Sequence, residues 1–232
     1  PFLIENIRIN DGKFAVFKHT KQKFVSVQKL NLLVENLQMT DESVEDKLPI
    51  EFDSYSIKGE KFFVRPNETY AITINSINTA DGQMSFENFR LTPLLSFAQF
   101  KKFYPRKSQL LECSIPKMEF KDVMLKKNKV SLNNVDFQNP AFTIYNTGIK
   151  SKKKEKKSDF EIDLKSFKLN NAVVQINKPD GNKLLAVGAL SLNISQLMFN
   201  KETSEQVIPF GYKDFLLSGR DVLYSNHQNI SI

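Results

Sequence analysis

The chain has 232 residues, of which 41% are hydrophobic and 25% are charged, a balance typical of a folded protein rather than a disordered one. The formal net charge is +7, but it falls to +2 without the six lysines and one glutamate of residues 150–157, which argues against a broad nucleic-acid surface. The single cysteine, Cys113, excludes an intramolecular disulfide, and no apolar run reaches the roughly 18–20 residues of a membrane helix.

Apolar and polar residues alternate along most of the chain, and a period of two is typical of strands with one buried face. Turn signals separate the runs at Asn10–Gly12, Asp81–Gly82, Asn139–Pro140 and Pro179–Gly181. We therefore predict an all-β protein of many short antiparallel strands. In chain order, the predicted strands are Ile7–Ile9, Phe14–Val16, Leu30–Val34, Phe62–Val64, Tyr70–Ile74, Met84–Phe89, Val130–Val135, Phe142–Tyr145, Phe160–Leu169, Val173–Ile176, Leu184–Ile194 and Phe215–Leu217.

One stretch departs from this period, since the apolar residues near 93–104 follow helical spacing. Thr92 can cap the first turn, Pro93 suits the first helical position, and Pro105 ends the pattern. We predict one short helix that packs across the sheet.

The chain also repeats itself at an offset of 160 residues, where 12 of 72 aligned positions are identical. Both copies change the parity of their apolar face at the same place, after Val34 and after Ile194, as a bulge or tight bend requires. We predict a first unit over 1–160, the start of a truncated second unit over 161–232, and a Lys-rich loop over 147–159. The fragment is expected to belong to a longer protein.

No catalytic constellation emerges from the sequence. His19 and His227 stand in polar, turn-like contexts without a cysteine or acidic cluster at metal-ligand spacing, and Cys113 has no histidine near it in sequence. We therefore expect no enzyme activity, no metal and no cofactor. The lysine run is interpreted first as a solvated connector. Contact with anionic lipid head groups is the second reading and nucleic acid the third; the candidate head-group residues are Lys152, Lys153, Lys154, Lys156 and Lys157.

The alternating strands produce an apolar face that something must cover. An elongated, curved sheet would leave an open groove suited to acyl chains, whereas a β-sandwich would close the face into a dry core. The candidate groove residues of the first copy are Ile7, Ile9, Phe14, Val16, Leu30, Leu32 and Val34. Those of the second copy are Phe167, Leu169, Val174, Ile176, Leu190, Leu192 and Ile194.

Segments Ile4–Phe17, Val27–Leu37, Phe167–Ile176 and Leu190–Leu197 resemble the repeats of AsmA-like proteins of the bacterial envelope, and Phe89–Phe100 with Ile115–Asp136 is similar to the large Bacteroidetes type. The resemblance implies a bridge-like lipid-transfer fold in the periplasm, anchored at the inner membrane through segments absent from this sequence. It further implies phospholipid or another acyl lipid as ligand, and a role in outer-membrane biogenesis. The alternative function is a structural or interaction β-domain of an envelope or surface protein with a closed core.

Overall fold

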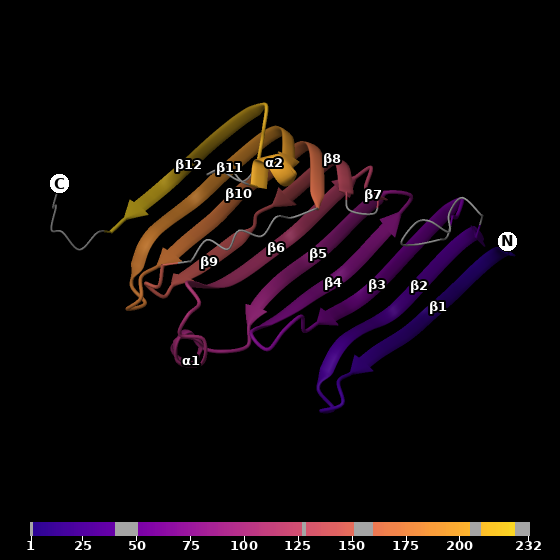
Figure 1. Cartoon of the computed structure of the whole chain (residues 1–232), viewed down its shortest axis with the longest axis horizontal. Coiled ribbons are helices and arrows are strands. Elements are labelled where there is room, and N and C mark those ends of the chain that lie inside the picture. Colours follow the sequence, from indigo (N-terminus) through magenta and orange to yellow (C-terminus); the bar gives the residue numbers. More distant parts are fainter. Residues whose placement is uncertain (1, 40–50, 127–128, 151–159, 205–209, 226–232) are drawn as a thin grey trace.

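The computed structural model describes residues 2–39, 51–126, 129–150, 160–204 and 210–225. Over these ranges the chain is all-β, as predicted, and its strands join in a single twelve-stranded sheet rather than the two facing sheets of a sandwich (Figure 1). The strands are β1 (Phe2–Phe17), β2 (Lys23–Met39), β3 (Ser54–Val64), β4 (Tyr70–Ala80), β5 (Gln83–Pro93), β6 (Gln109–Lys121), β7 (Met124–Lys126), β8 (Lys129–Gln138), β9 (Ala141–Asn146), β10 (Glu161–Asn177), β11 (Lys183–Phe199) and β12 (Asp214–Tyr224). The helices are α1 (Phe97–Phe103) and α2 (Lys201–Ser204).

The sheet follows chain order from β1 to β6 and continues through β8, β10 and β11 to β12. The predicted antiparallel pairing is wrong at one place, because β8 and β9 both pair with β10 in parallel. Parallel neighbours need a crossover connection, and residues 147–160 supply it between β9 and β10. The Lys-rich loop predicted over 147–159 falls within this connection, and its residues 151–159 lie outside the described ranges.

Several strands are longer than predicted, because two of the expected turns do not reverse the chain. Strand β1 runs straight through Asn10–Gly12, and Asn139–Pro140 only separates β8 from β9, which continue in the same direction along β10. The other two turn signals are confirmed, since Asp81–Gly82 and Pro179–Gly181 lie in the β4–β5 and β10–β11 hairpins. Turn-type residues in this chain therefore either reverse it at a hairpin or allow it to continue in the same direction through a local irregularity.

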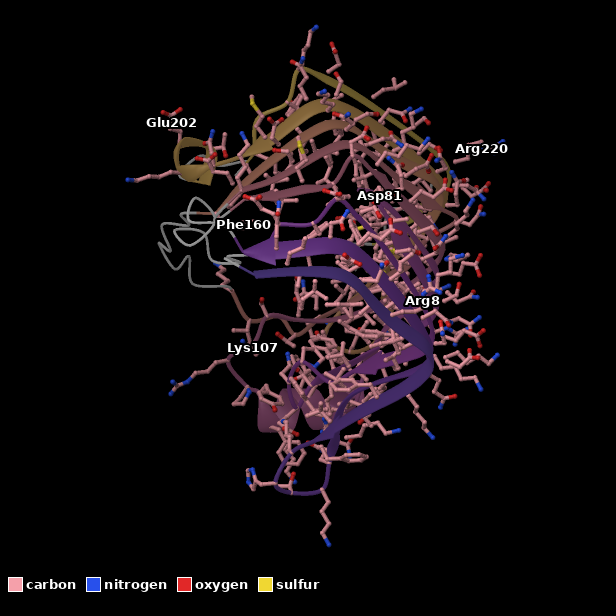
Figure 2. All side chains as sticks on the ribbon, turned by 90° about the vertical axis from the view of Figure 1, so that its right-hand side faces the viewer. Arg8, Asp81, Lys107, Phe160, Glu202 and Arg220 are labelled. Carbon is pink, nitrogen blue, oxygen red and sulfur yellow. The ribbon has the colours of Figure 1, made fainter. Side chains whose placement is uncertain are left out.

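A line of left-handed backbone crosses the sheet and explains the through-running turn signals. Register pairs are skipped or shifted beside these residues, for example between Glu87↔Lys117 and Phe89↔Ile115. Where the register also shifts, as between Ile9↔Leu32 and Gly12↔Leu30, the irregularity is a bulge, which bends a strand and increases its twist. Figure 2 shows the resulting bend, with Arg8 and Arg220 on its outer side. We call this line the crease; its residues, all with φ between 47° and 54°, are Asp11, Lys29, Lys61, Asn88, Asn139, Asn171 and Asp221.

The crease also accounts for a proline and a glycine inside central strands. Pro116 of β6 lies opposite Asn88, at the pair that the β5–β6 ladder skips, so its missing N–H removes no ladder bond. Gly188 of β11 lies opposite Asp221, and a Cβ at this glycine would come within 2.9 Å of the Asp221 Cβ. Gly188 thus permits a close approach of the two strands at the crease, whereas Pro116 is tolerated because its position in the ladder is unpaired.

The two copies of the repeat fold alike. Hairpins β1–β2 and β10–β11 pair in registers offset by 160 residues, as in Ile9↔Leu32 and Leu169↔Leu192, with irregularities at equivalent positions. The parity change predicted from sequence occurs at Asn36 and Gln196, whose φ angles are 52° and 51°. Beyond Asn36 and Gln196 the register is unchanged, because the residue opposite each of them is also left out of the pairing. The irregularity therefore crosses both strands of each hairpin.

Helix α1 confirms the predicted helix, but it begins later than expected and lies at the end of the strands rather than across the sheet (Figure 1). Pro93 still pairs with Tyr70 at the end of β5, so Thr92 does not cap the helix. The cap is Ser96, whose hydroxyl accepts from the Gln99 N–H while the Gln99 side chain accepts from the Ser96 N–H. Phe100 is the buried residue of the helix.

Candidate functional site

The inner side of the bend, which we call the concave face, is lined by apolar rows that cross the sheet from edge to edge. Register pairs connect one residue per strand, and in the best-defined row every residue is apolar. The concave face is therefore continuous over the described strands. This row consists of Val16, Val25, Val64, Ile72, Leu91, Cys113, Phe142, Val174, Val187 and Val222.

The outer, convex face carries polar side chains in matching rows. Figure 2 shows nitrogen and oxygen atoms at the tips of the side chains outside the bend, while carbon predominates inside it. Strand alternation produces this contrast, since neighbouring residues point to opposite faces. One convex row consists of Gln28, Glu60, Ser76, Glu87, Lys117, Gln138 and Asn170.

Burial of the concave face falls from the centre of the sheet toward its edges. Ile115 in β6 is only 4% exposed, because the two arms of the bent sheet bring Cys113, Met118 and several phenylalanines around it. Phe14 in β1 is 50% exposed and Leu217 in β12 is 51% exposed. No second sheet covers this face within the described ranges. The protein thus fills the centre with its own side chains and leaves the ends of the face accessible.

Phenylalanine rings form a chain of contacts along the concave face. Ring centroids lie 5.5 Å apart between Phe86 and Phe120, 5.9 Å between Phe120 and Phe137, and 5.5 Å between Phe137 and Phe167. The second and third contacts are edge-to-face, the arrangement that aromatic quadrupoles favour. The chain of rings links β5, β6, β8 and β10, so it joins the first copy to the second.

The structure places all the predicted groove residues on this one face. In the first copy, Ile7 pairs with Val34 and Ile9 with Leu32. In the second, Phe167 pairs with Ile194, and the remaining candidates occupy equivalent positions. Their role in lipid binding stays a prediction. Phe120 and Phe137, at the centre of the face, lie outside the repeated hairpins, so the repeat does not mark them. Phe137 continues the alternation of Val130–Val135, which was the signal available for it.

Polar chemistry on the concave face is sparse. Tyr55 and Thr79 place their hydroxyls on this face, 3.3 Å apart, and Thr79 is only 5% exposed. Cys113 adds a weakly polar thiol, and burial raises its pKa to about 11. His19 is exposed at the end of β1, whereas His227 lies outside the described residues. Over the described ranges no group of His, Cys, Asp and Glu side chains could hold a metal ion. No helix in those ranges is both long and apolar enough for a membrane span.

A hollow of about 550 Å³ lies beside the crease, but its lining differs from that of the concave face. Lys61, Asn75, Asn88 and Arg90 supply polar or charged groups to it, next to Phe62 and Phe63. An acyl chain offers no hydrogen-bonding partner to such groups, so this hollow does not suit a lipid tail.

The lysines predicted to contact head groups, Lys152 to Lys157, lie outside the described ranges, and the structure does not place them. No protein-family model, curated protein or solved structure matches this chain.

Proposed function

We propose that this chain is a non-enzymatic lipid-binding and lipid-transfer module whose concave face takes the acyl chains of phospholipid or another acyl lipid. The observation that carries the proposal is the continuous apolar face, which ends in edge strands whose inward side chains are half exposed. Burying such surface is favourable by about 0.8 kcal/mol per methylene and demands little directional recognition.

The proposal extends to an AsmA-like protein of the bacterial envelope, in the periplasm and attached to the inner membrane by segments beyond this sequence. Two features support it. The segments that carry the resemblance, Ile4–Phe17 and Phe167–Ile176 among them, contribute the equivalent strands β1 and β10 of one bent sheet. A sheet built from repeats also extends an apolar face without adding new chemistry, as movement of lipid between membranes in outer-membrane biogenesis would require.

A structural or interaction β-domain is the second candidate, and one observation favours it. At the centre of the sheet the concave face is filled by its own side chains, with Val135 and Ile115 almost fully buried. A dry core of this kind could hold the sheet together with no ligand.

Native mass spectrometry of the purified protein separates the two candidates, together with lipid extraction and a binding assay with a fluorescent phospholipid. We expect co-purified acyl lipid and saturable binding of the fluorescent probe. Absence of bound lipid together with failure of the probe to bind would exclude the lipid-binding proposal and leave the structural domain.

Adjacent residues on β12 provide a matched pair of variants. Leu217 faces the concave side in register with Leu192, whereas Leu216 pairs with Asn193 on the convex side and is 65% exposed. A carboxylate at Leu217 would have to be desolvated beneath an acyl chain, which is costly. We therefore expect Leu217→Asp to weaken probe binding at least tenfold and Leu216→Asp to leave it unchanged. Equal effects of the two variants would contradict the assigned face.

A further inference from the structure

Five connecting segments lie together at one end of the strands, along the lower edge of the sheet in Figure 1. Hydrogen bonds hold neighbouring segments together, since the Lys101 Nζ donates to the Pro179 carbonyl at 2.8 Å and the Thr147 N–H donates to the Ser108 carbonyl at 2.9 Å. We call this surface the basic edge; it comprises residues 17–23, 65–69, 94–108, 147–150 and 178–183.

Charge is distributed very unevenly between the two ends of the strands. The basic edge carries eleven lysines and arginines but only two acidic residues, Glu68 and Asp180. The described segments at the opposite end, which are residues 51–53, 81–82, 121–126, 129, 200–204 and 210–213, carry five basic and five acidic residues. The surplus of positive charge in the described protein is therefore concentrated on one edge.

The two acidic residues of the basic edge are occupied within the protein. Glu68 accepts from Lys18 at 2.9 Å and from Arg65 at 2.8 Å, and these partners lower the pKa of its carboxyl group. The Asp180 carboxylate accepts from both the backbone and the side-chain N–H of Asn182 within the β10–β11 turn. Most of the cations on this edge thus have no acidic residue of the same edge to neutralise them.

Exposed aromatic side chains accompany these cations. Phe17 is 56% exposed at the end of β1, and Phe103 is 60% exposed at the end of α1. The Lys102 Nζ lies 6.0 Å from the centroid of the Phe103 ring, so charge and apolar area occur side by side. Lysine and arginine beside exposed phenylalanine form the pattern of surfaces that lie in the interface of a bilayer.

We propose that the basic edge docks the protein on an anionic bilayer surface. Cations near such a surface are attracted to its negative potential, and Phe103 and Phe17 enter the acyl boundary. Nine of the eleven cations are lysines, point charges that pair with head groups without the planar recognition that arginine offers to nucleic acid. The inference is independent of the proposed lipid transfer, because docking uses the edge and lipid binding uses the concave face.

Vesicle co-sedimentation of the whole chain tests this docking. The probes are phosphatidylcholine vesicles with and without about 30 mol % phosphatidylglycerol, and we expect binding only to the anionic vesicles, with release at about 0.5 M salt. The double variant Lys102→Glu, Lys107→Glu should reduce partitioning at least tenfold. Its matched control, Lys121→Glu with Lys213→Glu, makes the same charge change at the opposite end and should bind like the wild type.

The aromatic contribution has a control of its own. Phe103→Ala should weaken binding several-fold, whereas Phe52→Ala, which removes a ring 45% exposed at the opposite end, should not.

Binding to neutral vesicles as strong as to anionic ones would overturn the proposal. So would an equal loss in the two charge-reversal pairs, or a clear preference for a single-stranded oligonucleotide over the vesicles. The Lys102→Glu, Lys107→Glu protein should still co-purify with acyl lipid if the concave face binds it, so failure of docking and failure of lipid binding are distinguishable.

Discussion

Cys113 illustrates at the scale of one residue how strongly the concave face excludes water. Its side chain lies between Leu91 and Phe142 in an apolar row and belongs to the cluster around Ile115 and Met118. Burial disfavours the thiolate, which raises the pKa of the thiol from 9.0 to about 11. The residue therefore acts as a small apolar group with a weakly polar atom.

This raised pKa predicts a pH dependence of stability. A thiol with a higher pKa in the folded state stabilises the fold fully below pH 9, and this contribution is lost as the pH rises from about 9 toward 11. The free energy of unfolding of the wild type should therefore fall over that range relative to Cys113→Ala, which lacks the titrating group. Urea titrations of both proteins at several pH values measure the difference. A difference that stays constant from pH 8 to about 11 would contradict the burial of the thiol.

At the scale of elements, the sequence predicted the strands well but not where they end. Alternation and the 160-residue offset identified the strands and the equivalent hairpins, because side-chain period and parity follow directly from the backbone. The sequence of Asn10–Gly12 predicts a turn, because the same residue types tolerate φ > 0 in turns and in bulges. Only the pairing with β2 on both sides of the segment distinguishes the two, and that pairing is tertiary information.

The crease predicts opposite outcomes for the same substitution at two positions. Asn88 has φ of 53°, and a β-branched residue there should cost about 1–2 kcal/mol of the free energy of unfolding. Asn88→Val should therefore destabilise the protein and Asn88→Gly should stay within about 0.5 kcal/mol. Asn78→Val, on the convex face of the adjacent strand β4, is the control and should be neutral or slightly stabilising, because valine favours strands. Chemical denaturation compares the four proteins, and equal effects at the two asparagines would refute a bend that depends on left-handed backbone.

At the scale of the whole molecule, the architecture depends on what covers the apolar face of the sheet. The alternation of apolar and polar residues along each strand does not specify this. The choice between a curved sheet and a sandwich was open from sequence because both need the same pattern on each strand. The parallel pairing of β8 and β9 with β10 does not follow from alternation for a related reason, because the pattern within a strand does not encode its direction. The fourteen residues that separate β9 from β10, long enough for a crossover, were the available signal.

Phe137 connects the two copies of the repeat and so tests the sheet as one cooperative unit. Its ring contacts Phe120 of the first copy and Phe167 of the second, and it packs against the cluster around Met118. Phe137→Ala should cost about 3 kcal/mol, because it leaves a cavity at the centre of the concave face. Phe215→Ala, which truncates a half-exposed ring on edge strand β12, should cost about 1 kcal/mol or less. Hydrogen exchange read separately in β1–β2 and β10–β11 should show lower protection in both hairpins of Phe137→Ala, since the ring lies between them. Loss of protection confined to one hairpin would mean that the copies unfold independently and that the bent sheet is two stability units joined side by side.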